Sequence, residues 1–346
     1  MNLADLGEFG LIERLAGKLS AVGAHPAAGS VDFAIGDDAS LLRLPPDTQL
    51  VTTIDALIEE VHFRRDWSRP EDLGWKALAV NVSDLGAMGA WPLAALISVA
   101  LPPDLPVRWI DRLYQGLGEC AKQYGCPLVG GDTVRSPKHL ALSVTALGSV
   151  PIGKAVRRAG ARVGDVLCVT GVLGESGAGL ELLQRYTSRK KKFASLYQGH
   201  LRPQPPVAAG ATLAEAGLPT AMMDLSDGLG SDLRHLTRAS GVGANIEVAR
   251  LPISDTTRQA AKELGVDPVR WALFGGEDYQ LLFTVSRDRF VEVAPILAPL
   301  GVTATIIGEI IQRGLKLRPP DGTTQDLRPE GFHHFAGSKA VADPRR

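Results

Sequence analysis

The spacing of hydrophobic residues predicts a chain in which helices alternate with strands. Apolar residues three or four positions apart share one face of a helix, whereas runs rich in β-branched residues favour strands. In the first half of the chain, helices are predicted at 7–19, 72–88 and 108–124. Strands are predicted at 50–54, 93–101, 127–129 and 140–149, and the first of them is expected to end at Asp55.

The second half of the chain repeats this alternation. Strands are predicted at 166–170, 221–224, 244–248, 281–285 and 304–308. Helices are predicted at 177–185, 207–216, 229–239, 257–264 and 288–298. Such alternation favours a layered α/β architecture. A break at Pro151-Ile152-Gly153 separates the halves, so we expect an N-terminal domain at 1–150 and a C-terminal domain at 151–340. Two domains are usual for a chain of 346 residues.

Composition and charge exclude several classes of protein. Hydrophobic residues make up 45% and charged residues 22% of the chain, which is the range of globular proteins. The 37 basic and 38 acidic residues nearly cancel, so nothing favours binding to nucleic acid or to a membrane. The 3 cysteines form no C-x-x-C pair, which argues against a disulfide scaffold and a zinc site. The acidic start, Met1–Asp5, is unlike a signal peptide, and we expect a cytoplasmic protein.

Acidic residues recur in six separate segments, four of which contain glycine, and we expect them at strand ends and helix starts. The segments are Gly36-Asp37-Asp38, Thr53-Ile54-Asp55, Asn81-Val82-Ser83-Asp84, Gly130-Gly131-Asp132, Asp224-Leu225-Ser226-Asp227-Gly228 and Gly275-Gly276-Glu277-Asp278. One aspartate beside a glycine is usually a turn residue or a helix cap, but six such segments are poorly explained in this way. Converging carboxylates repel one another unless a divalent cation binds, and oxygen ligands suit Mg²⁺ or Ca²⁺. Glycines let phosphates approach backbone N–H groups, so the pattern indicates Mg²⁺–nucleotide binding.

Other motifs compete weakly with this interpretation. The segment 171–177 follows a strand and precedes a helix, but it lacks the G-K-[ST] ending of a phosphate loop and indicates a tight turn. No G-x-S-x-G elbow is present. His62 fits either a hydrogen-bonded loop residue or a substrate contact, and the sequence leaves both open.

The ordered set of motifs resembles thiamine-monophosphate kinase, and the resemblance covers the chain from near residue 6 to about residue 335. The motifs of the first half are Leu6-Gly7-Glu8-Phe9-Gly10-Leu11-Ile12, Ile35-Gly36-Asp37-Asp38-Ala39, Glu60-Val61-His62-Phe63, Lys76-Ala77-Leu78-Ala79-Val80-Asn81-Val82-Ser83-Asp84-Leu85 and Gly130-Gly131-Asp132-Thr133. Those of the second half are His200-Leu201-Arg202-Pro203, Asp224-Leu225-Ser226-Asp227-Gly228-Leu229 and Gly275-Gly276-Glu277-Asp278-Tyr279.

The resemblance implies ATP-dependent phosphorylation of thiamine monophosphate to thiamine diphosphate, on the two-domain fold of aminoimidazole ribonucleotide synthetase. In that fold the N-terminal domain dimerises through its sheet, and ATP and several Mg²⁺ ions lie between the domains. Carried over by motif, the Mg²⁺ ligands would be Asp38, Thr53, Asp55, Asp84, Asp132, Asp224 and Asp227. Of these, Asp84, Asp132 and Asp227 are the expected catalytic residues. The ATP contacts would be Gly131, Asp132, Arg158 and Ser226, with Tyr114 beside the nucleotide, and the substrate contacts would be His62, Glu277 and Phe332.

Two positions leave alternatives open. Members of the family commonly carry a hydroxyl residue where this chain has Ile54, so a metal either loses a ligand or is bound by the backbone carbonyl of Ile54, which we favour. Phe332 either stacks on the cationic thiamine ring or packs into the core.

The expected reaction needs no general base, because the attacking phosphate is already ionised near neutral pH, its second pKa being about 6. Positioning and charge neutralisation are then enough for in-line transfer. The alternatives are another enzyme of the same fold, such as aminoimidazole ribonucleotide synthetase or selenophosphate synthetase, and a non-catalytic nucleotide-binding regulator.

Overall fold

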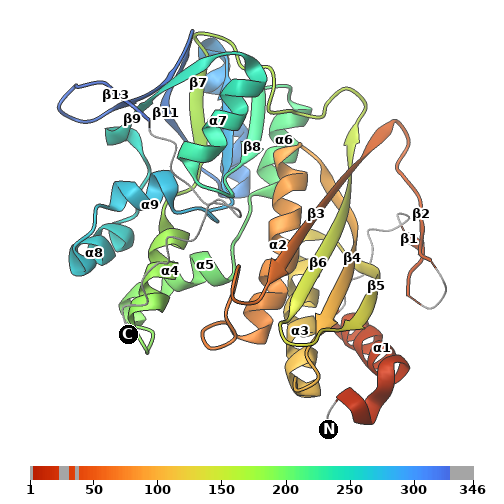
Figure 1. Ribbon diagram of the computed structural model, residues 1–346. Helices are drawn as coiled ribbons and strands as arrows, with labels where there is room; N and C mark the ends of the chain where they lie inside the picture. Colours follow the sequence, from red (N-terminus) through yellow and green to blue (C-terminus); the bar gives the residue numbers. More distant parts are fainter. Residues whose placement is uncertain (1–2, 23–30, 36–38, 328–346) are drawn as a thin grey trace. The chain divides into compact units, whose positions relative to one another are not determined.

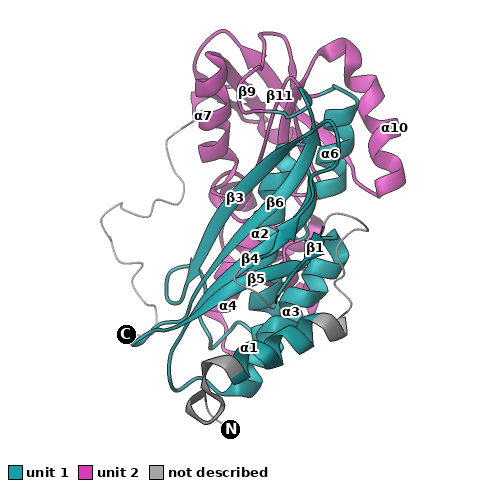
Figure 2. Ribbon diagram, turned by 90° about the vertical axis from the view of Figure 1, so that its right-hand side faces the viewer, with its two compact units in different colours: residues 1–156, 204–218 teal, residues 157–203, 219–346 magenta. Residues whose placement is uncertain are grey.

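The chain is organised in two units. A computed structural model describes residues 3–22, 31–35 and 39–327 (Figure 1). Unit 1 comprises Met1–Val156 and Gln204–Leu218, and unit 2 comprises Arg157–Pro203 and Pro219–Arg346 (Figure 2). The continuous part of unit 1 thus ends six residues after the boundary expected near residue 150. The segment 204–218, which comes from the middle of the second half, belongs to unit 1 because its helix packs there.

Unit 1 is built on a four-stranded sheet with the order β3-β6-β4-β5. Its strands are β3 (Thr48–Ile58), β4 (Trp91–Leu101), β5 (Leu128–Arg135) and β6 (Ala141–Pro151), preceded by the short pair β1 (Val31–Phe33) and β2 (Leu41–Leu42). Its helices are α1 (Leu3–Val22), α2 (Pro70–Ala87), α3 (Val107–Tyr124) and α6 (Val207–Glu215). β6 pairs antiparallel with both β3 and β4, and β5 pairs parallel with β4. β3 and β5 are therefore the two edges of the sheet.

Helix α2 is the centre of unit 1. It begins with Pro70, which suits the first helical position, and nearly all of its residues are buried. It packs against β3, β4 and β6, and α3 and α6 pack against it. Glycines allow this close packing: a Cβ on Gly74 would lie 1.9 Å from the carbonyl oxygen of Leu113, and one on Gly116 would lie 1.9 Å from that of Glu71. The helices cover one face of the sheet, which fixes the direction in which the side chains of α2 point.

The other face of this sheet carries exposed apolar side chains. Along β3, alternate residues point to opposite faces, and Leu50, Ile54 and Ile58 are 49%, 64% and 41% exposed. We call the face that bears these three residues the open face. Figure 2 shows the sheet with α2 and α3 behind it.

Unit 2 contains a seven-stranded sheet with the order β13-β12-β9-β11-β7-β10-β8. Its strands are β7 (Val166–Thr170), β8 (Ala221–Asp224), β9 (Gly243–Glu247), β10 (Leu281–Val285), β11 (Ala304–Ile311), β12 (Leu315–Arg318) and β13 (Gln325–Asp326). Its α-helices are α4 (Glu175–Arg185), α5 (Ala194–Leu201), α7 (Leu229–Ser240), α8 (Asp255–Leu264), α9 (Pro268–Phe274) and α10 (Val293–Leu297). Short 3-10 helices lie at Lys191–Phe193, Val248–Arg250, Arg287–Glu292 and Ala298–Leu300. All pairs are antiparallel except β12–β9.

The expected helices and strands agree with the structure at most positions, and the layered α/β fold is confirmed. The expectation that the acids lie at strand ends and helix starts is wrong for three of them. β3 continues past Asp55 to Ile58, Asp132 lies inside β5, and Asp84 lies in the last turn of α2. Both strands are edges of the sheet, where a carboxylate on the strand still reaches solvent. None of the described helices combines the length and the hydropathy that a membrane span requires.

Candidate functional site

Three segments of unit 2 meet at one end of its sheet: the loop after β7, the loop after β8 and the loop before β10. β10 pairs antiparallel with both β7 and β8, so its beginning lies beside the ends of the other two strands. Hydrogen bonds join the segments directly. The N–H of Leu281 donates to Oγ1 of Thr170 at 2.9 Å, and the N–H of Leu225 donates to the carbonyl of Gln280 at 2.9 Å. Two motifs some fifty residues apart in sequence therefore become neighbours.

The Gly275–Tyr279 loop has an unusual backbone. Gly276, Glu277 and Tyr279 have φ angles of 66°, 57° and 49°, in the left-handed region that residues with a side chain rarely adopt. The loop after β8 holds them: the N–H of Glu277 donates to the carbonyl of Ser226 at 2.7 Å, and that of Tyr279 to the carbonyl of Leu225 at 2.9 Å. Strain of this kind persists only where the surroundings impose it, and it is common at functional sites.

Three aspartates crowd the loop after β8. Asp224 is buried at the end of β8, and Asp227 follows in the loop. Asp232, on the first turns of α7, accepts hydrogen bonds from the N–H groups of Asp227 and Gly228, both at 3.1 Å. Burial, followed by the charges of Asp227 and Asp224, raises the pKa of Asp232 to about 8. The site thus carries more negative charge than it can easily hold, which is the setting that a bound divalent cation stabilises. Asp232 was not among the expected site residues, and no motif singled it out.

Asp278 caps the first turn of α4 from outside the helix. Its carboxylate accepts the N–H of Gly174 at 2.7 Å and that of Ser176 at 3.3 Å. Burial raises the pKa of Asp278 to about 7, although both of these hydrogen bonds act to lower it. A phosphate would need the same N–H groups, so the segment 171–177 is a strand-to-helix turn closed by an internal carboxylate.

A buried histidine lies beside Glu277. His200 on α5 is 3% exposed, and its Nδ1 is 3.1 Å from Oε2 of Glu277 and 3.1 Å from Oγ of Ser176. All three residues belong to unit 2. The sequence offered His200 only as part of the His200-Leu201-Arg202-Pro203 motif, with no role attached.

In unit 1, Thr53, Asp55 and Asp84 lie between β3 and α2. The Oγ1 of Thr53 donates a hydrogen bond of 2.5 Å to Oδ2 of Asp84. Asp55 is two residues along β3 and points to the same face of the sheet as Thr53. The side chain of Ile54 points to the open face, away from these acids, so the only group of Ile54 that a metal could use with them is its backbone carbonyl.

Asp132 is not close to this group. It pairs in register with Ser98 of β4, whose side chain is exposed on the open face, and partners in register point to the same face. β6 and β4 lie between β3 and β5, which separates the two edge strands by about 14 Å. Gly131, beside it, has no room for a side chain, because a Cβ would lie 2.2 Å from the carbonyl oxygen of Ile97.

His62 lies in a turn just after β3. Its Nδ1 accepts the N–H of Ile58 at 3.0 Å, which leaves Nε2 as the nitrogen that carries the proton in the neutral ring. The turn is fixed at its base by Glu59, which is 6% exposed, pairs with Arg65 and accepts the N–H of Leu140 at 2.9 Å.

The remaining expected residues lie apart from these groups or outside the described part of the chain. Tyr114 is 5% exposed in the hydrophobic core of unit 1. The carbonyl of Arg158 accepts a hydrogen bond from Ser240, at the opposite end of α7 from Asp227, so the backbone of Arg158 is about one helix length away from that loop. Asp37, Asp38 and Phe332 lie outside the described residues.

The oxygen atoms of these aspartates and of Thr53 are of the chemical type that binds Mg²⁺, because carboxylate and hydroxyl oxygens are its usual protein ligands. Within 3–22, 31–35 and 39–327, however, no three His, Cys, Asp or Glu side chains are arranged to hold an ion. The structure therefore provides partial ligand sets, one on β3 and α2 and one at the loop after β8.

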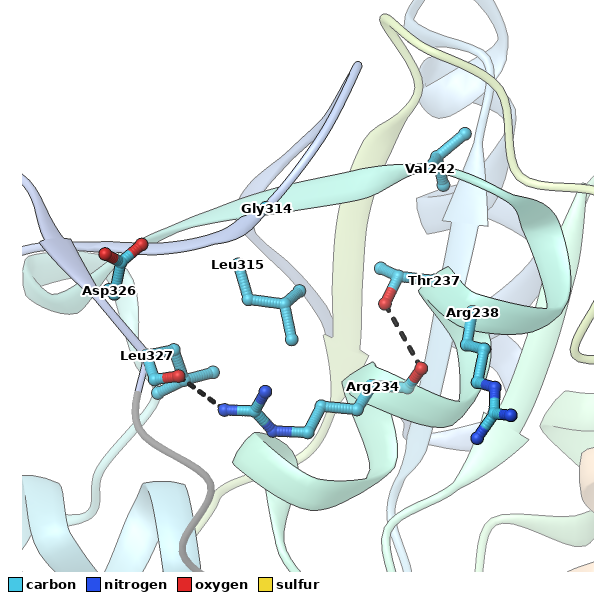
Figure 3. Close-up of a pocket in the computed structure, with 8 residues that line it drawn as sticks. All are labelled: Arg234, Thr237, Arg238, Val242, Gly314, Leu315, Asp326 and Leu327. Carbon is cyan, nitrogen blue, oxygen red and sulfur yellow. Dashed lines mark hydrogen bonds between the residues drawn. The ribbon is translucent and has the colours of Figure 1, made fainter.

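A separate pocket of about 570 Å³ lies on another face of α7 (Figure 3). It is lined by Arg234, Thr237, Arg238, Val242, Gly314, Leu315, Asp326 and Leu327. Arg234 and Asp232 are two residues apart on the helix and so point in nearly opposite directions. Arg234 donates a hydrogen bond to the carbonyl of Leu327, and none of the site residues named above lines this pocket.

Comparison with known proteins identifies matches over most of the chain. Residues 36–150 match the N-terminal domain of AIR synthase related proteins, and residues 162–318 match their C-terminal domain. Thiamine-monophosphate kinase from Escherichia coli strain K12 is 39% identical over 336 residues, covering 95% of this chain and 98% of the relative. The Bacillus subtilis strain 168 protein of the same name is 38% identical, covering 88% and 94%.

Solved structures of thiamine-monophosphate kinases are also similar to this chain. The crystal structure of thiamine-monophosphate kinase from Stenotrophomonas maltophilia K279a is similar with a TM-score of 0.81 and 36% identity, covering 91% of this chain and 97% of that one. A complex of AaThiL with AMPPCP and TMP is similar with a TM-score of 0.75 and 37% identity, covering 97% and 99%.

Proposed function

The chain belongs to the thiamine-monophosphate kinases of the AIR synthase related family, and we propose that it transfers the γ-phosphoryl group of ATP to thiamine monophosphate, giving thiamine diphosphate. The observation that carries the proposal is the match to a kinase of this name over 95% of the chain. AMPPCP is an analogue of ATP, and its presence with TMP in a solved relative supports the two substrates.

We assign Mg²⁺ binding to the two partial ligand sets. In unit 1 the ligands are Thr53, Asp55 and Asp84, with the carbonyl of Ile54; in unit 2 they are Asp224 and Asp227; and Asp38 and Asp132 complete the assignment. Bound Mg²⁺ would neutralise the phosphates of both substrates, which carboxylates alone would repel. Burial is the largest cause of the raised pKa of Asp232, and the charges of Asp227 and Asp224 raise it further, which supports a cation beside these two acids.

The chain's own groups bind and orient the substrates. No base is needed to activate the acceptor, since a phosphate monoester has a second pKa of about 6. Ser226, Gly131 and Arg158 are assigned to ATP, where the guanidinium adds a permanent positive charge. The contact of Tyr114 with the nucleotide stays a prediction, since the burial of this residue in the core offers no support for it.

Glu277 and His62 are assigned to thiamine monophosphate, together with Phe332. A carboxylate attracts the positively charged thiazolium ring and repels the phosphate, so Glu277 fits the ring. Because Nδ1 of His62 accepts the N–H of Ile58, Nε2 carries the proton of the neutral ring, and an N–H donor suits an acceptor such as a phosphate oxygen.

We further propose a homodimer that joins the open faces of two unit 1 sheets. Exposed apolar side chains grouped on a sheet face are typical of an interface. Asp132 points to the open face and would lie in this interface, whereas Asp55 points to the opposite face, beside α2. A cytoplasmic location stays a prediction.

The function is tested by incubating the purified protein with ATP, Mg²⁺ and thiamine monophosphate and following the phosphorus signals by ³¹P NMR. We expect ADP and thiamine diphosphate in equal amounts. ADP formed equally well without thiamine monophosphate would favour another ATP-dependent enzyme of this fold, and nucleotide binding without turnover would favour a regulator.

A further inference from the structure

Close contacts at two glycines of α4 hold α5 and the Gly275–Tyr279 loop against this helix. A Cβ on Gly179 would lie 2.1 Å from the carbonyl oxygen of Leu196 on α5, and one on Gly177 would lie 2.9 Å from the Cα of Gly275. The backbones of α5 and of the loop therefore both press against α4. Side chains that reach from α5 to the loop have little freedom to move.

His200 is the residue of α5 that makes this connection. Its ring is buried, and the same Cβ on Gly179 would lie 3.2 Å from the Cβ of His200, so the backbone of α4 holds the histidine in place. The side chain of Glu277 is 25% exposed, which leaves it open to a ligand while its Oε2 stays 3.1 Å from Nδ1 of His200.

The chemistry of the partners decides which nitrogen carries the proton. An ionised carboxylate only accepts hydrogen bonds, so Nδ1 must donate to Glu277. Ser176 is then a second acceptor at the same N–H, at 3.1 Å. A Ser–His–acid triad is excluded, because such a triad places the serine and the acid on different ring nitrogens. The ring of His200 therefore donates to the carboxylate of Glu277 and does not act as a base toward Ser176.

We propose that His200 is a positioning residue, which through its Nδ1–H holds the carboxylate of Glu277 in the orientation that receives the cationic thiazolium ring of thiamine monophosphate. The proposal rests on the proposed function. Glu277 has a long side chain on a strained backbone, and fixing its carboxylate before the substrate arrives lowers the entropic cost of binding. ATP makes no contact with this pair in the assignment above, so the effect is specific to one substrate.

The test compares three variants. His200→Leu removes the donor at similar size, whereas His200→Asn keeps an N–H donor at the δ position. We expect His200→Leu to raise KM for thiamine monophosphate about tenfold, the effect of losing a charge-assisted hydrogen bond, and to change KM for ATP less than twofold. His200→Asn should restore most of the loss. Ser176→Ala, which removes the other partner of Nδ1, should change either KM less than twofold.

A double variant separates positioning from general loosening of the fold. If His200 acts through Glu277, adding His200→Leu to Glu277→Gln raises KM for thiamine monophosphate no further than Glu277→Gln alone. Additive effects, an equal rise in both KM values, or an unchanged KM in His200→Leu would overturn the proposal.

A spectroscopic measurement on the wild-type protein tests the proposal with a readout that does not depend on activity. In ¹H–¹⁵N spectra of the histidine rings of the wild-type protein, the signals lost in His200→Asn identify His200, and we expect its proton on Nδ1. A neutral ring protonated on Nε2 alone would overturn the proposal. Absence of thiamine diphosphate formation by the wild-type protein would instead overturn the proposed function, leaving the hydrogen bond to be judged by the spectrum.

Discussion

Thr53 donates a hydrogen bond of 2.5 Å to Asp84, and this bond joins the edge strand β3 to the central helix α2. It orients the carboxylate of Asp84, which is partly exposed on a helix whose other residues are nearly all buried. Because Thr53 is part of a regular strand and Asp84 of a regular helix, the pair has a fixed geometry without any contribution from a loop.

We expect Asp84→Ala to lower turnover about 100-fold or more, because it removes an assigned Mg²⁺ ligand, with the fold retained. Steady-state kinetics over a range of Mg²⁺ concentrations, with circular dichroism for the fold, measure this. Asp104→Asn, a change at an exposed acid of the same unit, is the control and should behave like the wild type. Near wild-type kinetics for Asp84→Ala at limiting Mg²⁺ would refute the assignment.

Ile54→Lys tests the open face. Its side chain is 64% exposed in one chain, and a charge placed there would be buried in the proposed dimer. We expect the variant to sediment as a monomer at concentrations where the wild type is a dimer. Val291→Lys changes a side chain of unit 2 that is 74% exposed and should leave the sedimentation coefficient unchanged. A wild-type protein that sediments as a monomer would contradict the dimer directly.

Asp278 predicts a pH dependence of stability. Burial raises its pKa in the folded state to about 7, whereas an unfolded aspartate has a pKa of about 3.9. Between these values the folded state keeps a proton that the unfolded state has lost, so the free energy of unfolding falls as the pH rises from about 4 to 7. The slope is at most about 1.4 kcal/mol per pH unit.

Asp278→Asn should remove this contribution to the slope, since the amide does not ionise. Urea unfolding of unit 2, followed in metal-free buffer at several pH values, measures it. Below pH 7 the neutral carboxyl of the wild type and the amide of the variant each offer one carbonyl acceptor to the first turn of α4, so the slope is the informative quantity. Equal slopes in the two proteins would show that Asp278 is ionised throughout this range.

Two glycines of unit 1 are expected to respond in opposite directions. In Gly131→Ala the new Cβ would lie 2.2 Å from the backbone oxygen of Ile97, so β5 must move and the unit loses about 1–3 kcal/mol of stability. Gly17 is exposed within α1 and has nothing within 4 Å of its Cβ position, so Gly17→Ala should gain about 0.5–1 kcal/mol. Thermal unfolding compares them, and a stable Gly131→Ala protein would show that β4 and β5 can separate at no cost.

The sequence by itself determined the acidic segments and the type and position of most of the elements, although α5, α9, β12 and β13 were not predicted. The helix at 72–88 and the strand at 93–101 agree with α2 and β4 to within two residues, because the period of a helix or a strand is written locally in the positions of apolar side chains. The motifs around Asp84, Asp224 and Glu277 were likewise readable as candidate sites, although which ligand each one contacts stays a prediction.

Only the tertiary structure decided which of these residues are neighbours. The antiparallel pairing of β8 with β10 places Ser226 against Glu277, and the strand order β3-β6-β4-β5 separates Asp55 from Asp132. The packing of α6 on α2 assigns residues 204–218 to unit 1. Asp232, Asp278 and His200 acquired their roles in the same way, through burial beside backbone N–H groups or another acid. The pairing of distant strands depends on which apolar surfaces the folded chain buries and on the entropic cost of closing the loops between the strands. No local pattern of residues specifies this pairing.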